Sequence, residues 1–236
     1  MKSINLQERS LSKFSLETLT NSDTLLPCEK IGNCVINRID NTSIGILNML
    51  VMYKWNVVIP EKFNVIEPFI ELALNRMEDQ NLLLMYPYAY LTIRQNYETT
   101  TDAEWHLDGY SSKLKNPEQI FVWSDTGGTE ISNSPVEIPE GFDPTIHNLY
   151  KSFRFYNDPD IITSNENDVY HIDTYNMHRR NPDISNSNRF FLRLAFSQIL
   201  FNDITMTTNP LITVAERVQL TNGRLYRDVL LDALEF

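Results

Sequence analysis

Residues 88 to 200 consist of short β-rich runs separated by polar loops, with no helical periodicity between the runs. Residues 89–97 illustrate the pattern, because Tyr90, Thr92 and Arg94 would lie on one face of a strand and the residues between them on the other. Strands connected by polar loops rather than by helices are typical of an antiparallel sandwich or barrel. The expected fold class is therefore mainly β with flanking helices.

We expect a single domain over residues 1–236, because the length suits one large β unit. Its N-terminal region, about residues 1–85, is predicted to be helical or irregular. The β core follows over about residues 88–200, and a partly helical tail is expected over about 201–236.

One helix is predicted over residues 67–79, where Ile70, Leu74 and Met77 recur at the spacing of a single helix face. The apolar segment 44–55 has mixed spacing and fits either a helix or a buried strand. Periodicity alone does not choose between these two structures.

The charge of the chain limits its partners. It has 20 Lys and Arg against 31 Asp and Glu, a net charge of −11, which repels phosphate backbones and argues against binding to a DNA or RNA duplex. Its two cysteines suit free thiols in a reducing compartment rather than a disulfide scaffold. No apolar stretch reaches the ~20 residues that span a bilayer, so we expect a cytoplasmic protein without a membrane partner.

His106 and Asp108 form an H-x-D motif. In a strand, residues two positions apart point to the same face, so the imidazole and the carboxylate would lie side by side. Borderline metals such as Fe(II) accept this mixture of nitrogen and oxygen ligands. The motif is common by chance, however, and a metal site needs a third ligand from elsewhere in the chain.

Two histidines could supply that third ligand. His178 follows the turn after the predicted strand 168–175 and precedes the loop to the next strand, whereas His171 lies in the middle of the strand. We therefore favour His178 as the ligand and expect His171 to occupy the core or to lie beside the site.

Two arginines occupy one face of the predicted strand 189–199. Arg189 opens this otherwise apolar strand, and Arg193 follows four residues later. A buried guanidinium is costly unless it meets an anion, and its planar fork suits a carboxylate. Either arginine could bind an organic acid, and we favour Arg189.

An H-x-D motif followed by a distant His and then an Arg resembles the Fe(II)/2-oxoglutarate-dependent oxygenase superfamily. The resemblance covers about residues 88–200 and implies a double-stranded β-helix core, also called a jelly roll and cupin-like. It implies that His106, Asp108 and His178 are the metal ligands. Arg189, eleven residues past His178, matches the residue that binds the far carboxylate of 2-oxoglutarate in that family.

The resemblance extends to three further candidate cosubstrate residues. Arg193 would meet the C1 carboxylate of 2-oxoglutarate, the substrate or a surface acid, or would take the place of Arg189. Tyr90 and Thr92 precede the H-x-D motif, where family members often supply a hydroxyl group to 2-oxoglutarate. A solvent-facing strand edge is an equally good interpretation of Tyr90 and Thr92.

The implied activity is hydroxylation of a small-molecule or amino-acid-type substrate, with Fe(II) as cofactor and 2-oxoglutarate and dioxygen as cosubstrates. Succinate and CO₂ would be released. Halogenating relatives carry a small residue in place of the carboxylate, so Asp108 favours hydroxylation or desaturation. The alternatives are a catalytically inactive jelly-roll protein that binds metal or acts as a scaffold, and a zinc-dependent hydrolase, which would leave Arg189 without a role. The sequence predicts neither the substrate nor the oligomeric state.

Overall fold

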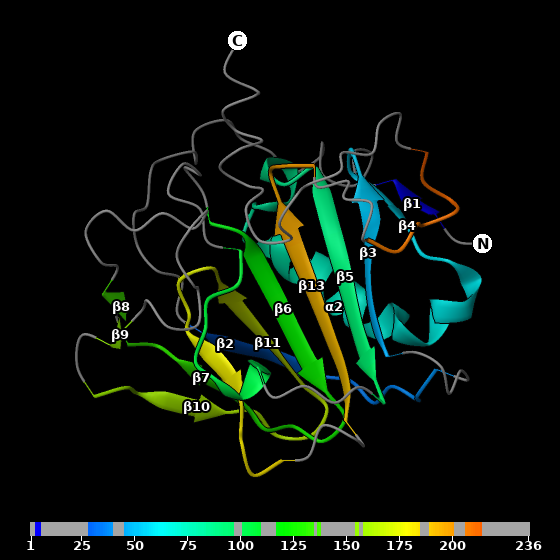
Figure 1. The fold of residues 1–236 in the computed structure, drawn as a ribbon. Helices are drawn as coiled ribbons and strands as arrows, with labels where there is room; N and C mark the ends of the chain where they lie inside the picture. The colour runs from blue at the N-terminus through cyan, green and yellow to red at the C-terminus, as the bar shows by residue number, and fades with distance from the viewer. Residues whose placement is uncertain are drawn as a thin grey trace.

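The computed structural model of the chain describes residues 3–5, 28–39, 45–96, 101–109, 117–134, 136–137, 154–155, 158–184, 189–200 and 206–213. These residues are mainly β structure, with one α-helix among them, and every strand of the sheets pairs antiparallel with its neighbours (Figure 1). The mainly β class expected from the sequence is confirmed.

The largest sheet has eight strands. Their spatial order is β1 (Ser3–Asn5), β4 (Asn56–Val58), β3 (Ile46–Tyr53), β5 (Tyr88–Gln95), β13 (Phe190–Ser197), β6 (Gln119–Ser124), β11 (Asp168–Asp173) and β2 (Glu29–Asn33). The central strand β13 pairs with both β5 and β6, and Arg193 lies opposite Thr92 on one side and Val122 on the other. Strand β6 is buried along its whole length, because both faces of the sheet are covered there.

A smaller sheet covers part of one face of the large sheet. It contains β10 (Ile161–Thr163), β7 (Thr129–Ser132) and β12 (His178–Arg180), and a separate pair joins β8 (Val136–Glu137) to β9 (Arg154–Phe155). Ile131 of β7 packs with Ile120 and Val122 of β6 in one buried apolar cluster. Side chains of the two sheets therefore meet in the space between them.

Helix α2 (Glu67–Asp79) covers the opposite face of the large sheet. It follows the 3-10 helix η2 (Glu61–Ile66), and η3 (Leu83–Met85) leads from it to β5. A further 3-10 helix, η4 (Thr101–Ala103), lies after β5. Ile70, Leu74 and Met77 are all buried, so the helix predicted over residues 67–79 is confirmed. Among the described residues, no helix is long and apolar enough to cross a lipid bilayer.

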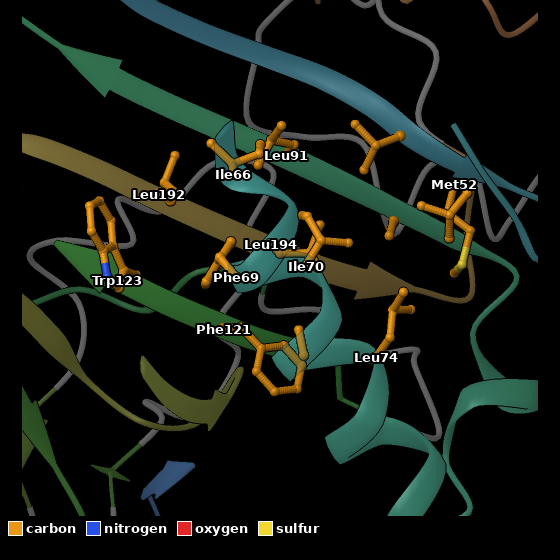
Figure 2. Close-up of a cluster of buried hydrophobic side chains, with 14 of the residues drawn as sticks. Met52, Ile66, Phe69, Ile70, Leu74, Leu91, Phe121, Trp123, Leu192 and Leu194 are labelled. Atoms are coloured by element: carbon orange, nitrogen blue, oxygen red, sulfur yellow. The ribbon is translucent and has the colours of Figure 1, made fainter. Parts of the chain in front are cut away.

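The core between α2 and the large sheet is the main apolar cluster. Figure 2 shows Phe69 and Ile70 of the helix close to Leu194 and Phe121, which come from β13 and β6. These four side chains are at most 2 % exposed. Burying each aliphatic or aromatic side chain of this kind stabilises the fold by roughly 1.5–3 kcal/mol.

The region before residue 85 contains the helix α2, as expected, but its described residues also supply four strands of the large sheet, β1 to β4, which were not expected. Segment 46–53 is a strand, with Met49 paired to Leu91 of β5. Its spacing was ambiguous because the register shifts between Leu50 and Met52, so that the four residues 49–52 are all buried and the alternation is broken.

The tail expected to be partly helical over 201–236 is described only from 206 to 213. No helix forms in that stretch, where Thr207 makes a single parallel bridge to Met49 of β3. The rest of this predicted tail lies outside the described residues.

Candidate metal centre

His106 and His178 are brought together by their own backbones. They form an isolated antiparallel bridge, in which the N–H of each residue donates to the carbonyl of the other at an N–O distance of 3.1 Å. Their imidazole rings are 4.5 Å apart between centroids. Both side chains are buried, so the bridge fixes two histidine rings side by side between the two sheets.

The side chain of Asp108 points in the same direction as that of His106 and lies beside the two histidine rings. One possible ligand atom from each of the three side chains lies within 4.8 Å of the others. Leu107, between His106 and Asp108, points away and packs with Met177 in a small apolar cluster. The predicted i, i+2 alternation is therefore present, although the segment forms one isolated bridge rather than the strand we expected.

Each histidine ring is hydrogen-bonded to a backbone carbonyl through Nδ1, which leaves Nε2 as the possible metal ligand. His106 Nδ1 lies 2.7 Å from the carbonyl oxygen of Glu104, and His178 Nδ1 lies 3.0 Å from that of Asn176. A carbonyl only accepts, so Nδ1 is the donor in both neutral rings and Nε2 is the nitrogen that can ligate a metal. His178 Nε2 already faces the third candidate ligand, at 3.3 Å from Asp108 Oδ2. Metal-ligating histidines are usually oriented in this way.

The charges of the site also suit a metal ligand set. Burial, followed by the nearby His178, lowers the pKa of His106 to about 4, which keeps this imidazole neutral at pH 7. Burial alone would raise the pKa of Asp108, but Arg193 and the two histidines hold it well below its ordinary value. The cluster therefore offers an ionised carboxylate beside imidazole nitrogens and could hold a borderline divalent metal.

Arg193 points at Asp108 and not at a distant anion. From β13 it donates to Asp108 Oδ2 and, at 3.2 Å, to Thr92 Oγ1. The Thr92 hydroxyl in turn donates to Asn48 Oδ1 at 2.7 Å. Arg193 thus contacts a candidate metal ligand, Asp108, directly. The sequence did not predict this contact.

Arg189 occupies a different environment from Arg193. It is 5 % exposed, donates from Nε to Ser124 Oγ at 3.0 Å and from a terminal nitrogen to Thr129 Oγ1 at 2.6 Å. No carboxylate of the described residues lies within salt-bridge distance of its guanidinium. Burial lowers the pKa of Arg189 to about 10, so the group still carries its charge at pH 7. Among the described residues, this buried cation therefore contacts two neutral hydroxyl groups and the ring of Phe191, 4.9 Å from its centroid, but no carboxylate.

Asp102 and Arg180 are two buried residues near the centre that the sequence analysis overlooked. Asp102, in η4, bonds Arg180 through one oxygen at 3.1 Å and Arg94 through the other at 3.3 Å. Arg180 is 9 % exposed and belongs to β12. Its position two residues after His178 was the available signal, since the two side chains share a strand face.

The hydroxyl groups of Tyr90 and Thr92, which were predicted to contact 2-oxoglutarate, are hydrogen-bonded within the protein. Tyr90 donates to the carbonyl of Ile199 at 3.1 Å, and Thr92 donates to Asn48. A hydroxyl has only one proton, so neither has a second one to give to a carboxylate.

His171 lies on the other face of the large sheet, as expected for a core residue. Its Nε2 is 2.8 Å from Gln119 Oε1, and its ring stacks on Phe121 at a centroid distance of 4.4 Å. Phe121 belongs to the core under α2, so His171 faces the helix rather than His106.

Neither a protein-family model nor a curated protein matches this chain. Its function must therefore be inferred from the chemistry of the residues that the fold brings together.

Proposed function

We propose that the chain is an Fe(II)- and 2-oxoglutarate-dependent dioxygenase that hydroxylates a small-molecule or amino-acid-type substrate. The observation that carries the proposal is the convergence of His106, Asp108 and His178 within 4.8 Å. Two histidines and one carboxylate, with the remaining positions open, are the ligand set of non-haem Fe(II) oxygenases. In the reaction, one oxygen atom enters the substrate C–H bond and the other enters succinate, while CO₂ is released.

The winding of the strands supports a double-stranded β-helix for the core. Along the chain, β5 belongs to the large sheet, the His106 segment bridges to the small sheet, and β6 returns to the large one. Strands β7 and β10 are in the small sheet, β11 in the large, β12 in the small and β13 in the large. Apart from β7 and β10, which pair with each other in the small sheet, successive segments thus alternate between two antiparallel sheets, which is consistent with a jelly roll.

The protein side chains have distinct roles in this proposal. Fe(II), when bound, supplies the redox chemistry with dioxygen that the side chains of the chain cannot perform. His106 and His178 bind through Nε2, because their Nδ1 protons are held by the carbonyls of Glu104 and Asn176. Asp108 supplies the anionic ligand, and its presence favours hydroxylation or desaturation over halogenation.

Arg189 is the proposed partner of the far carboxylate of 2-oxoglutarate. Its charge is buried and, among the described residues, meets two hydroxyl groups and the Phe191 ring but no carboxylate, and burial of such a cation is offset when a carboxylate binds. Ser124 and Thr129 hold one edge of the guanidinium, so its orientation is fixed before the anion arrives. The remaining N–H groups are available for a charge-assisted pair.

Iron analysis and a succinate assay test the proposal without a known substrate. Protein purified without oxygen should bind Fe(II), and addition of 2-oxoglutarate should give the visible charge-transfer absorption of an Fe(II) chelate with a 2-oxo acid. Slow succinate release should then depend on both Fe(II) and dioxygen. Metal binding with no response to 2-oxoglutarate would instead indicate a metal-binding scaffold or, with zinc bound, a hydrolase.

A further inference from the structure

A row of three side chains crosses the large sheet and ends at the candidate metal centre. Arg193 of β13 lies opposite Thr92 of β5, and Thr92 lies opposite Asn48 of β3. Their side chains are linked in the same order, with Arg193 to Thr92 at 3.2 Å and Thr92 to Asn48 at 2.7 Å. We propose that Thr92 and Asn48 are positioning residues, which act through Arg193 to hold the carboxylate of Asp108 in place for the metal.

The direction of every hydrogen bond in this row is fixed by chemistry. Arginine has only donors and an ionised aspartate only accepts, so Arg193 must donate to Asp108 and to Thr92. Thr92 has one proton, and it goes to Asn48 Oδ1 because its contact with Arg193 is as an acceptor. Asn48 therefore sets the rotation of the Thr92 hydroxyl that receives the guanidinium.

Thr92, next to Arg193 in the row, is buried and held in place, whereas Asn48, at the far end of the row, is exposed to solvent. Thr92 is 2 % exposed and lies on a strand that pairs on both sides, so its hydroxyl has little freedom. Asn48 is exposed, although its backbone carbonyl accepts a hydrogen bond from Thr207 N–H at 2.8 Å. Loss of the Asn48 side chain can therefore be compensated by water, while loss of the Thr92 hydroxyl cannot.

The consequence concerns how Asp108 meets a metal. Arg193 occupies one lone pair of Oδ2, the oxygen that also lies 3.3 Å from His178 Nε2, and this fixed orientation favours ligation through one carboxylate oxygen rather than both. A second bound oxygen would fill a coordination position that the proposed reaction needs open. The inference rests on the proposed metal centre and adds to it the residues that orient its acid.

Titration of the metal-free protein with Co(II) tests the proposed role of the row. It measures the affinity for Co(II) and the visible absorption spectrum of the bound ion, and it requires no turnover. Thr92→Val keeps the size of the side chain and every charge, so a change reports position and not net electrostatics. We expect about 10-fold weaker Co(II) binding, as for other residues that orient metal ligands, together with an altered spectrum. Thr92→Ser should restore both, and Asn48→Ala should give a smaller loss of affinity than Thr92→Val.

The matched control is Thr129→Val, which removes the same hydroxyl group beside Arg189 instead of Arg193. It should leave Co(II) affinity and spectrum unchanged. The row is overturned if Thr92→Val, or Thr92→Ala should Thr92→Val not fold, binds Co(II) like the wild type. A wild-type protein that binds no Co(II) would overturn the proposed metal centre, and the row with it.

Discussion

His106 and His178 exchange both of their backbone hydrogen bonds, at 3.1 Å each, although strands β6 to β11 lie between them in the chain. The spacing of the two imidazole rings is thus set by main-chain pairing and does not depend on either side chain. Substitution of one histidine can therefore remove a ligand while the bridge, which uses only N–H and C=O groups, remains.

The first prediction separates the two candidate distal ligands. His178→Ala should abolish stoichiometric Fe(II) binding, because it removes one of the three ligands. His171→Ala should keep it, because His171 bonds Gln119 on the opposite face of the sheet. Metal analysis of both purified variants checks this. The ligand assignment is wrong if the two results are reversed.

The second prediction concerns the cosubstrate. Arg189→Ala should raise the apparent KM for 2-oxoglutarate by roughly 30-fold or more, since loss of a desolvated Arg–carboxylate pair costs on the order of 2–5 kcal/mol and each ~1.4 kcal/mol is tenfold. Fe(II) binding should persist, because Arg189 contacts Ser124 and Thr129 rather than a candidate ligand.

Arg193→Ala is the comparison for Arg189→Ala. Arg193 donates to Asp108, so its loss should change the metal affinity as well as turnover. Titrations of each variant with Fe(II) and with 2-oxoglutarate distinguish the two defects. A larger 2-oxoglutarate defect in Arg193→Ala than in Arg189→Ala would show that the far carboxylate had been assigned to the wrong arginine.

A third prediction concerns the turn after β6. Gly127 has a φ of +64°, and a Cβ atom there would lie 2.7 Å from backbone atoms of Ser164 and Asn165. Gly127→Ala should destabilise the fold by at least about 1–3 kcal/mol, because a left-handed backbone and a backbone clash both resist it.

Gly32 provides the control for Gly127. An added Cβ would meet only the end of the Leu72 side chain, at 3.3 Å, and the φ of Gly32 is not positive. Gly32→Ala should therefore change the free energy of unfolding by less than Gly127→Ala. Urea denaturation of the metal-free proteins measures both, and equal losses would contradict the backbone explanation.

The fourth prediction is a pH dependence of stability. Burial, with a smaller effect of Arg76, lowers the pKa of His171 to about 3, whereas an unfolded histidine titrates near pH ~6.5. The unfolded state therefore takes up the proton first as the pH falls. The stability that neutral His171 provides is complete above about pH 6.5 and is lost progressively between about pH 6.5 and 3.

His171→Gln should remove the pH-dependent contribution of His171 to stability, while its amide N–H can still donate a hydrogen bond to Gln119 Oε1. Between pH 7.5 and 5, the metal-free variant should lose about 2 kcal/mol less stability than the wild type. His106, whose pKa is lowered to about 4, adds a loss of the same sign in both proteins. Urea unfolding at the two pH values provides the measurement, and equal acid sensitivity of the two proteins would refute the assignment.

The sequence by itself determined the features that depend on residues close together in the chain. The spacing of Ile70, Leu74 and Met77 defines a helix face because helical residues three and four apart are neighbours. The positions of His106 and Asp108 define a shared side because an extended backbone alternates its side chains. Segment 46–53 could not be assigned in this way, since its pairing with β5 depends on residues far along the chain.

The tertiary structure alone decided which of these local faces meet. Arg193 and Asp108 are 85 positions apart, and nothing near Arg193 in the sequence indicates that its partner is a candidate metal ligand. His178 lies beside His106, and His171 does not, because β11 turns His171 toward α2. Local spacing sets the direction of a side chain, but its partner is set by the pairing of distant strands, which burial of the whole core stabilises.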